Sequence, residues 1–144
     1  MSDQHTYTTS LTWKETRRGE FSPSGLPPLE VATPPEFPGG IAGIWSPEHL
    51  FVAAAEACLM TTFLAIAANS KIEFESYESE AVGTLETTDE GMQITGIVLR
   101  PHVTINDEAR VDRVTRILEK AEKHCLISNS MKSLITLEPT VTVV

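Results

Sequence analysis

The chain contains two cysteines, and their thiols are the groups best suited to chemistry. Cys58 lies in an apolar stretch and Cys125 follows a charged segment. A thiolate is a strong nucleophile and a metal ligand, and a free cysteine has a pKa of about 8.5. Neither cysteine has a Cys-X-X-Cys partner, so the spacing excludes a thioredoxin-type motif and the common zinc fingers. The remaining interpretations are a reactive thiol or two small buried hydrophobic side chains.

A reactive Cys58 needs stabilisation of its thiolate from outside its own helix. It lies about 15 Å beyond the helix start expected near Pro47, and the helix dipole acts only within the first turn. Apolar and acidic surroundings raise the pKa of a thiol. We therefore expect a nearby cation, preferably arginine, which stays charged when buried. Arg17 and Arg18 are the candidates, although a solvated hairpin turn would also explain them.

Glu48 is the candidate for holding such an arginine. It precedes Cys58 by ten residues, which in a helix places it about 15 Å away along the axis and roughly 80° around it. Glu48 therefore cannot contact Cys58 of its own chain. Either an arginine bridges the two residues or a second subunit supplies Glu48, and both arrangements favour a site built at an interface. Alternatively, Glu48 only interacts with the dipole at the helix start.

The histidines give little support for a metal site. His124 adjoins Cys125, but adjacent residues on a helix point apart, and the other histidines are scattered at His5, His49 and His102. Zinc bound by both cysteines and a histidine after folding remains a distant alternative. We expect no metal and no other cofactor.

Composition and charge restrict the partners and the location. The 144 residues carry a formal charge of −9, which repels phosphates, so nucleic acids and anionic membranes are not expected as partners. The longest apolar stretch is interrupted by Glu56 and two threonines, which argues against a membrane span. The N-terminus lacks the pattern of a signal peptide. A cytoplasmic location follows, where a permanent disulfide is unusual.

The predicted elements indicate an α+β fold in one domain. Ser46, Pro47 and Glu48 form a helix start, and the run that follows to Asn69 is apolar on most of its circumference, as in the central helix of a small domain or a dimer. A second helix is expected at residues 108–124. Alternating or β-rich segments predict strands at residues 6–13, 29–32, 72–87, 92–105 and 133–144. Further features are hairpin turns at Gly19 and at 89–91, a loop at 33–43, a bulge or edge feature at Gly96 or Pro101, and a short turn or helix at 128–132.

Two motifs resemble the OsmC/Ohr family. The first is Ser-Pro-Glu-His-Leu-Phe-Val-Ala-Ala-Ala-Glu-Ala-Cys at residues 46–58, in which a proline–glutamate helix start leads to a cysteine ten residues after the glutamate. The second is the cysteine at 125 followed by the pair Ser128 and Asn129. The resemblance extends from about residue 7 to 144. It departs from the family at Leu126 and Ile127, where many relatives have a proline.

The resemblance implies one OsmC-like domain, residues 1–144, with antiparallel sheets around a long central helix in an intertwined homodimer. It implies a cysteine peroxidase of the osmotically induced and organic-hydroperoxide-resistance type. By that likeness Cys58 is the peroxidatic cysteine and Cys125 the resolving cysteine. An arginine from the N-terminal segment, Arg17 or Arg18, pairs with Glu48 and activates the sulfur.

The expected mechanism is reduction of organic hydroperoxides, and hydrogen peroxide as a further substrate, through a Cys58 sulfenic acid. Cys125 then forms a disulfide, which an external dithiol reduces. Apolar side chains near Cys58 would favour a hydrophobic peroxide, although a core position also explains them: Phe51, Leu59, Met60 and Phe63. The alternative is a non-catalytic OsmC-like dimer that binds an apolar small molecule between its subunits.

Overall fold

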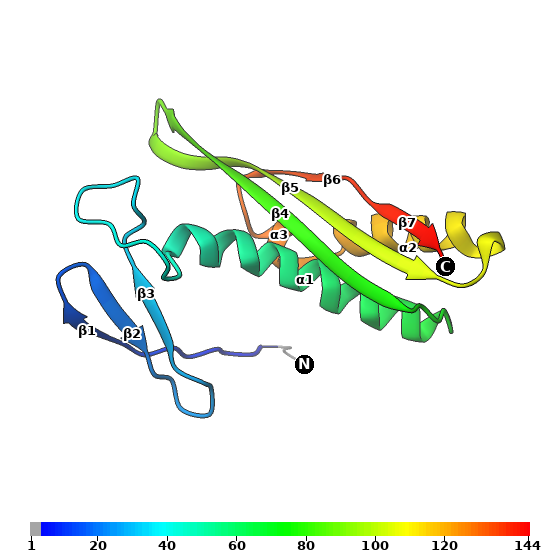
Figure 1. Ribbon diagram of the computed structural model, residues 1–144, viewed down its shortest axis with the longest axis horizontal. Coiled ribbons are helices and arrows are strands. Elements are labelled where there is room, and N and C mark those ends of the chain that lie inside the picture. Colours follow the sequence, from blue (N-terminus) through cyan, green and yellow to red (C-terminus); the bar gives the residue numbers. More distant parts are fainter. Residues whose placement is uncertain (1–3) are drawn as a thin grey trace. The chain divides into compact units, whose positions relative to one another are not determined.

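The computed structural model describes residues 4–144, and the chain divides after Leu50 into two compact units. The first unit contains a three-stranded sheet and the start of the long helix (Figure 1). The second contains the rest of that helix, a four-stranded sheet and the remaining helices. The single domain expected from the sequence stays a prediction.

The sheet of the first unit is antiparallel, in the order β1-β2-β3. Its strands are β1 (Leu11–Glu15), β2 (Arg18–Phe21) and β3 (Leu29–Ala32). The first strand therefore begins later than the predicted residue 6. The hairpin turn is at Thr16 and Arg17 rather than at Gly19, which pairs with Trp13 and Val31 inside the sheet. A Cβ atom at Gly19 would stand 3.0 Å from the Thr12 carbonyl oxygen, so close strand packing explains this glycine.

The predicted loop at 33–43 contains no helix or strand. A Cβ atom at Gly40 would lie 1.9 Å from the Pro34 carbonyl oxygen, so this tight fold requires glycine. Within one copy of the chain, the first unit buries few of its side chains. Among the hydrophobic residues at positions 4–50, only Val31 and Ala32 are buried, while Trp13 is 72% exposed.

Helix α1 (Pro47–Asn69) has the predicted bounds. The hydroxyl oxygen of Ser46 accepts a hydrogen bond from the His49 N–H at 3.1 Å, which satisfies one free donor at the helix start. Its length and composition would also suit a membrane span, but the core helix of a soluble protein has the same properties. Four of its buried side chains belong to the main core of the protein: Ala55, Leu59, Phe63 and Ala67.

The second sheet is mixed, which corrects the expectation of antiparallel sheets only. Strands β4 (Ser76–Thr88) and β5 (Gly91–Ile105) form an antiparallel hairpin, and β6 (Leu134–Leu137) and β7 (Thr140–Val143) pair with β5 in parallel. The chain returns to β5 through helices, and such a crossover gives a parallel pair. The strand predicted at 133–144 is interrupted near Pro139, which cannot donate a ladder hydrogen bond.

The β4–β5 hairpin has a bulge at the glycine that the sequence singled out. Thr84 pairs with Gly96 and Leu85 pairs with Ile94, so Thr95 is the extra residue. Close to the bulge, Gly83 allows β4 to approach α1. A Cβ atom at Gly83 would stand 2.5 Å from a methyl carbon of Val52.

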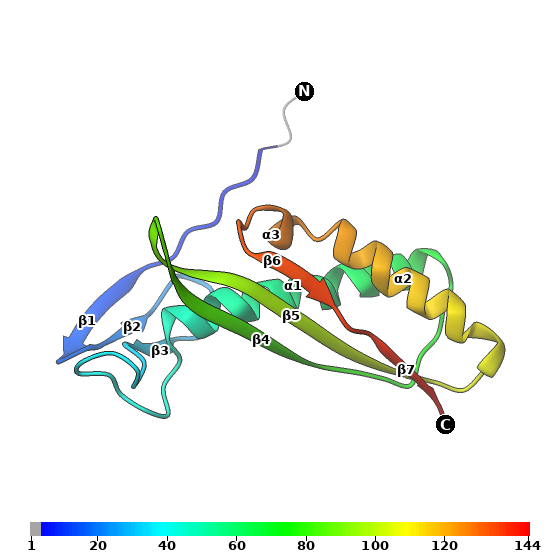
Figure 2. The same ribbon diagram turned by 90° about the horizontal axis from the view of Figure 1, so that it is seen from above.

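The core lies between the second sheet and helices α1 and α2, which lie on the same face of that sheet (Figures 1 and 2). Helix α2 (Val111–Lys123) follows a short 3-10 helix, Glu108–Arg110, whose start is capped by Asp107. Alternate residues of β5 face inward. The fully buried hydrophobic side chains of the core are Ala55, Leu59, Phe63, Ala67, Ile97, Leu99, Val103, Ile105, Val114, Leu118 and Ala121.

Candidate functional site

Cys125 lies at the junction of α2 and the short helix α3 (Leu126–Asn129), and it is completely buried. Its N–H donates to the Glu122 carbonyl oxygen at 3.2 Å, and its own carbonyl oxygen accepts from the Asn129 N–H at 3.0 Å. The Asn129 side chain donates back to the Lys123 carbonyl oxygen at 3.3 Å. Asn129, which the second motif contains, therefore fixes the turn that holds the Cys125 sulfur.

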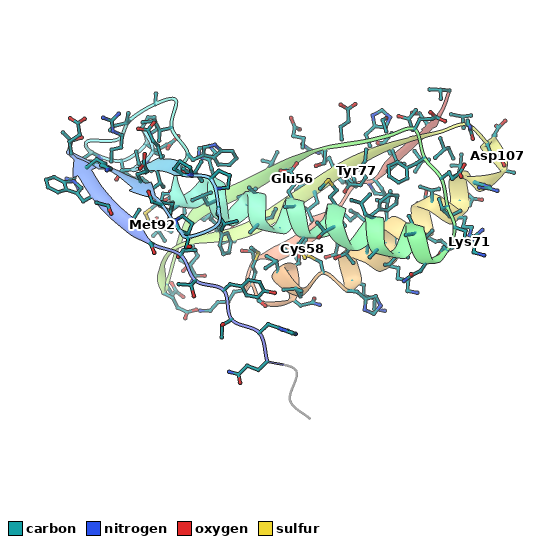
Figure 3. The ribbon with its side chains drawn as sticks, turned by 90° about the horizontal axis from the view of Figure 1, so that it is seen from below. Glu56, Cys58, Lys71, Tyr77, Met92 and Asp107 are labelled. Carbon is teal, nitrogen blue, oxygen red and sulfur yellow. The ribbon has the colours of Figure 1, made fainter. Side chains whose placement is uncertain are left out.

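Cys58 lies on α1 at the edge of its buried face and is 9% exposed. In Figure 3 it is on the opposite side of α1 from Glu56 and from Tyr77 of β4; Glu56 faces this strand and accepts a hydrogen bond from its Ser79. The Cys125 thiol is close enough for each of the two thiols to shift the pKa of the other, and both are free. The fold thus brings together the two cysteines that the sequence separates.

The surroundings of Cys58 lower the pKa of its thiol. Burial raises this pKa, but hydrogen bonds outweigh the effect. In order of size they come from the Cys125 thiol, the Ile127 N–H, the Thr62 hydroxyl and the Leu126 N–H. Hydrogen bonds donated to a thiolate favour the charged form. Ionisation of Cys58 is therefore easier than for a free cysteine.

The pKa of Cys125 is shifted in the opposite direction. Burial raises it most, and the hydrogen bond to Cys58 and the negative charge of that sulfur raise it further. Hydrogen bonds from Ser128 offset part of this rise. Of the two thiols, Cys58 is therefore the one whose ionisation is favoured by its surroundings, and Cys125 is the one whose ionisation is disfavoured.

The donors around Cys58 differ from those that the sequence led us to expect. We predicted that a cation is required, whereas within the second unit uncharged donors lower the pKa. Thr62 was missed, although its position four residues after Cys58 places both side chains on one helix face. The Leu126 and Ile127 amides were missed because only the fold brings α3 to α1. A proline at position 126 would have no N–H to donate.

The two candidate arginines differ in their surroundings within the first unit. Arg18 forms ion pairs with Glu15 and with Glu30, the latter at 4.0 Å. Arg17 forms no ion pair among residues 4–144, and its side chain lies over Gly39. A Cβ atom at Gly39 would stand 3.0 Å from the Arg17 Cγ and Nε atoms. Of the two arginines, Arg17 is therefore the one whose guanidinium has no carboxylate partner within residues 4–144.

Glu48 lies in the first turn of α1, as predicted. Its Oε1 atom is buried and has no hydrogen-bond partner within residues 4–144. No ion pair joins Glu48 to Arg17 or Arg18 in that range. An ionised carboxylate with a buried, unpaired oxygen needs a partner, so the arginine–Glu48 pair stays a prediction for a larger assembly.

The apolar side chains around Cys58 divide into two groups. Leu59 and Phe63 are fully buried in the core, whereas Phe51 and Met60 are each 37% exposed. Leu126, next to Cys125, is 68% exposed. Of the four apolar residues expected near the substrate, Phe51 and Met60 are thus the ones that an incoming molecule can reach.

No group of three or more His, Cys, Asp or Glu side chains is placed to hold a metal ion, as far as the described residues extend. His124 is exposed at the end of α2. The thiol pair is therefore the centre of the candidate site.

The fold and the thiol pair define the class of the protein. The family model of OsmC-like proteins matches residues 40–140, a region that contains both cysteines. The chain therefore belongs to the OsmC family. This agrees with the resemblance of the two motifs.

Individual relatives support this assignment. The chain is 27% identical over 142 residues to the uncharacterized protein YmaD of Bacillus subtilis, covering 96% of this chain and 93% of that protein. An OsmC-like protein of unknown function from Vibrio cholerae has a structure with a TM-score of 0.86 and 26% identity, covering 94% of this chain and 99% of that one. An organic hydroperoxide resistance protein OsmC from Legionella pneumophila matches with a TM-score of 0.74 and 27% identity, covering 97% and 100%.

Proposed function

We propose that this protein is a thiol-dependent peroxidase that reduces organic hydroperoxides, and hydrogen peroxide as a further substrate. The observation that carries the proposal is that the fold brings two free, buried thiols, Cys58 and Cys125, close enough for each to affect the ionisation of the other. Such a pair contains a nucleophile, Cys58, and a protonated partner, Cys125. The hydroperoxide resistance protein of Legionella pneumophila supports the substrate class.

In the first step the Cys58 thiolate attacks the terminal oxygen of the hydroperoxide. A sulfur–oxygen bond forms, the O–O bond breaks, and its electron pair leaves on the alkoxide, which takes up a proton to become the alcohol. Cys58 is then a sulfenic acid. The lowered pKa of Cys58 supports this step because the thiolate is the nucleophile.

In the second step the Cys125 sulfur attacks the sulfur of the sulfenic acid. The disulfide forms and the hydroxyl leaves as water with the thiol proton of Cys125. The proximity of the two thiols supports this step. The disulfide itself requires the two Cα atoms to lie within about 7 Å of each other. An external dithiol then reduces the disulfide by exchange and is itself oxidised to a disulfide.

We further propose that the protein acts as a homodimer. Between the ends of α1, its exposed residues have small or apolar side chains, among them Ala57, Met60 and Leu64. Strand β4, thirteen residues long, is an unpaired edge of its sheet, and the first unit buries few side chains within one chain. Long exposed edges and apolar faces are normally covered in native proteins. A second copy of the chain covers them without another partner.

We propose that the charged part of the site, an arginine paired with Glu48, is completed in this dimer. Arg17, without an ion pair in residues 4–144, is our choice for the activating arginine, and Arg18 is the second choice. Glu48 then pairs with this arginine and satisfies its buried oxygen. The guanidinium stabilises the Cys58 thiolate and the leaving alkoxide. The cytoplasm, where dithiols are maintained, is the proposed location.

The test is turnover of an organic hydroperoxide, with dithiothreitol as the dithiol. We expect many equivalents of cumene hydroperoxide to be reduced by the wild-type protein and none above background by Cys58→Ser. Wild-type protein that consumes no hydroperoxide contradicts the proposal and favours a non-catalytic dimer that binds an apolar molecule between its subunits. Arg17→Met and Arg18→Met then separate the two arginines, and we expect the larger loss for Arg17→Met.

A further inference from the structure

Three threonines lie within the two long helices, and two of them use their hydroxyl groups in the same way. The Thr61 hydroxyl donates to the Cys58 carbonyl oxygen at 3.1 Å, and the Thr115 hydroxyl donates to the Val111 carbonyl oxygen at 2.9 Å. Such bonds to the preceding turn are the usual arrangement for threonine in a helix. Thr62 is the exception, because its Oγ1 atom lies 3.9 Å from the Cys58 sulfur.

The position of Thr62 leaves its hydroxyl few other partners. Thr62 is half-buried on α1, one helical turn after Cys58 and on the same face. The Cys58 sulfur is the hydrogen-bond partner of its hydroxyl within residues 4–144. A thiolate can only accept hydrogen bonds, so when Cys58 is ionised the Thr62 hydroxyl is the donor.

We propose that Thr62 is a functional residue of the site, whose hydroxyl donates a hydrogen bond to the Cys58 thiolate and increases the reactivity of this sulfur at neutral pH. The inference rests on the proposed function for its use of Cys58 as the peroxide nucleophile. The direction of the Cys58 pKa agrees with it, since Thr62 is one of the groups that lower this value.

The contribution of Thr62 differs from that of Cys125. The Cys125 thiol loses its proton when the disulfide forms, and so it cannot donate in that state. The Thr62 hydroxyl takes no part in the redox steps. It is in place when reduction releases the Cys58 thiolate, and it therefore supports each new cycle.

The experiment compares Thr62→Val, Thr62→Ser and Thr61→Val. Valine has nearly the shape of threonine without the hydroxyl, and serine keeps the hydroxyl. Thr61→Val is the matched control, because it removes a hydroxyl from the same helical turn that bonds to the backbone. The pKa of Cys58 is measured from the pH dependence of its alkylation by iodoacetamide, with the modified peptide identified by mass spectrometry.

We expect Thr62→Val to raise the Cys58 pKa by about half a unit or more, as removal of one modest hydrogen bond to a charged group implies. Thr62→Ser and Thr61→Val should remain close to wild type. A Thr62→Val pKa equal to that of wild type, or an equal rise in Thr61→Val, overturns the inference. Because serine retains the hydroxyl, the difference between Thr62→Ser and Thr62→Val is decisive even when valine affects packing.

The hydroperoxide assay separates this inference from the proposed function. A raised pKa in Thr62→Val together with slower peroxide reduction supports both. A raised pKa in a protein that reduces no hydroperoxide supports the hydrogen bond and contradicts the peroxidase. Active wild-type protein with an unchanged pKa in Thr62→Val contradicts only the role of Thr62.

Discussion

Removal of the Cys125 thiol should change the ionisation of Cys58 before any peroxide is added. Among the groups that lower the pKa of Cys58, the Cys125 thiol has the largest effect. Cys125→Ala removes this donor, whereas Cys125→Ser replaces it with a hydroxyl. We therefore expect the pKa of Cys58 to rise in Cys125→Ala and to stay closer to the wild-type value in Cys125→Ser.

The size of the effect follows from one hydrogen bond. A net contribution of about 1 kcal/mol corresponds to about 0.7 pKa unit. Below the pKa, the thiolate fraction then falls about fivefold. The more basic thiolate is intrinsically about twofold more nucleophilic, given a Brønsted coefficient of about 0.45. The alkylation rate at pH 7 should therefore fall about two- to threefold, while the plateau at high pH rises about twofold.

The assay is the complete pH–rate profile of iodoacetamide alkylation, which gives the pKa and the plateau separately. A rise in the midpoint together with a higher plateau is the predicted result for Cys125→Ala. The reasoning is refuted when Cys125→Ala leaves the midpoint in place or lowers it. Equal shifts in Cys125→Ala and Cys125→Ser also refute it, because only one of them lacks a donor.

Further predictions concern packing and assembly. Gly83→Ala should destabilise the protein by about 1–3 kcal/mol in urea unfolding, since its new methyl group overlaps Val52. The double variant Gly83→Ala/Val52→Ala should lose less stability than the sum of the two single variants. Strict additivity would contradict this packing. Tyr77→Phe should leave the free energy of unfolding unchanged or raise it by up to about 1 kcal/mol, because the Tyr77 hydroxyl is buried without a hydrogen-bond partner in residues 4–144. A clear loss of stability would show that the hydroxyl has a partner in the assembly. Ala57→Glu should convert the proposed dimer to monomers in sedimentation experiments, since it would bury a charge in the proposed interface, whereas the exposed control Ala109→Glu should not. A dimeric Ala57→Glu protein would contradict the proposed interface on α1.

Local signals in the sequence predicted much of the fold. Ser46 and Pro47 set the start of α1, and the spacing of apolar residues identified the buried face of α2, from Val114 to Ala121. These features depend on neighbouring residues along one helix. The turn at Thr16 was not predicted, because the need for glycine at Gly19 comes from a neighbouring strand.

The donors of the candidate site were harder to predict than its sulfurs. Cys58 and Cys125 were recognised from their motifs, but their contact depends on how α2 and α3 pack against α1. The Leu126 and Ile127 amides carry no side-chain signal, so the sequence indicated only an arginine, which stays a prediction. The parallel pairing of β6 and β7 was missed for a related reason, since strand direction depends on the crossover through α2.

The most direct test of the account is the oxidation product of the wild-type protein. Reduced protein is treated with one equivalent of cumene hydroperoxide, and its intact mass and non-reduced peptides are then measured. We predict the loss of two hydrogens from each chain and a single peptide pair joined between Cys58 and Cys125. Unchanged thiols after complete mixing, or oxidation of Cys58 without a disulfide to Cys125, would contradict the central claim that these two sulfurs form one redox pair.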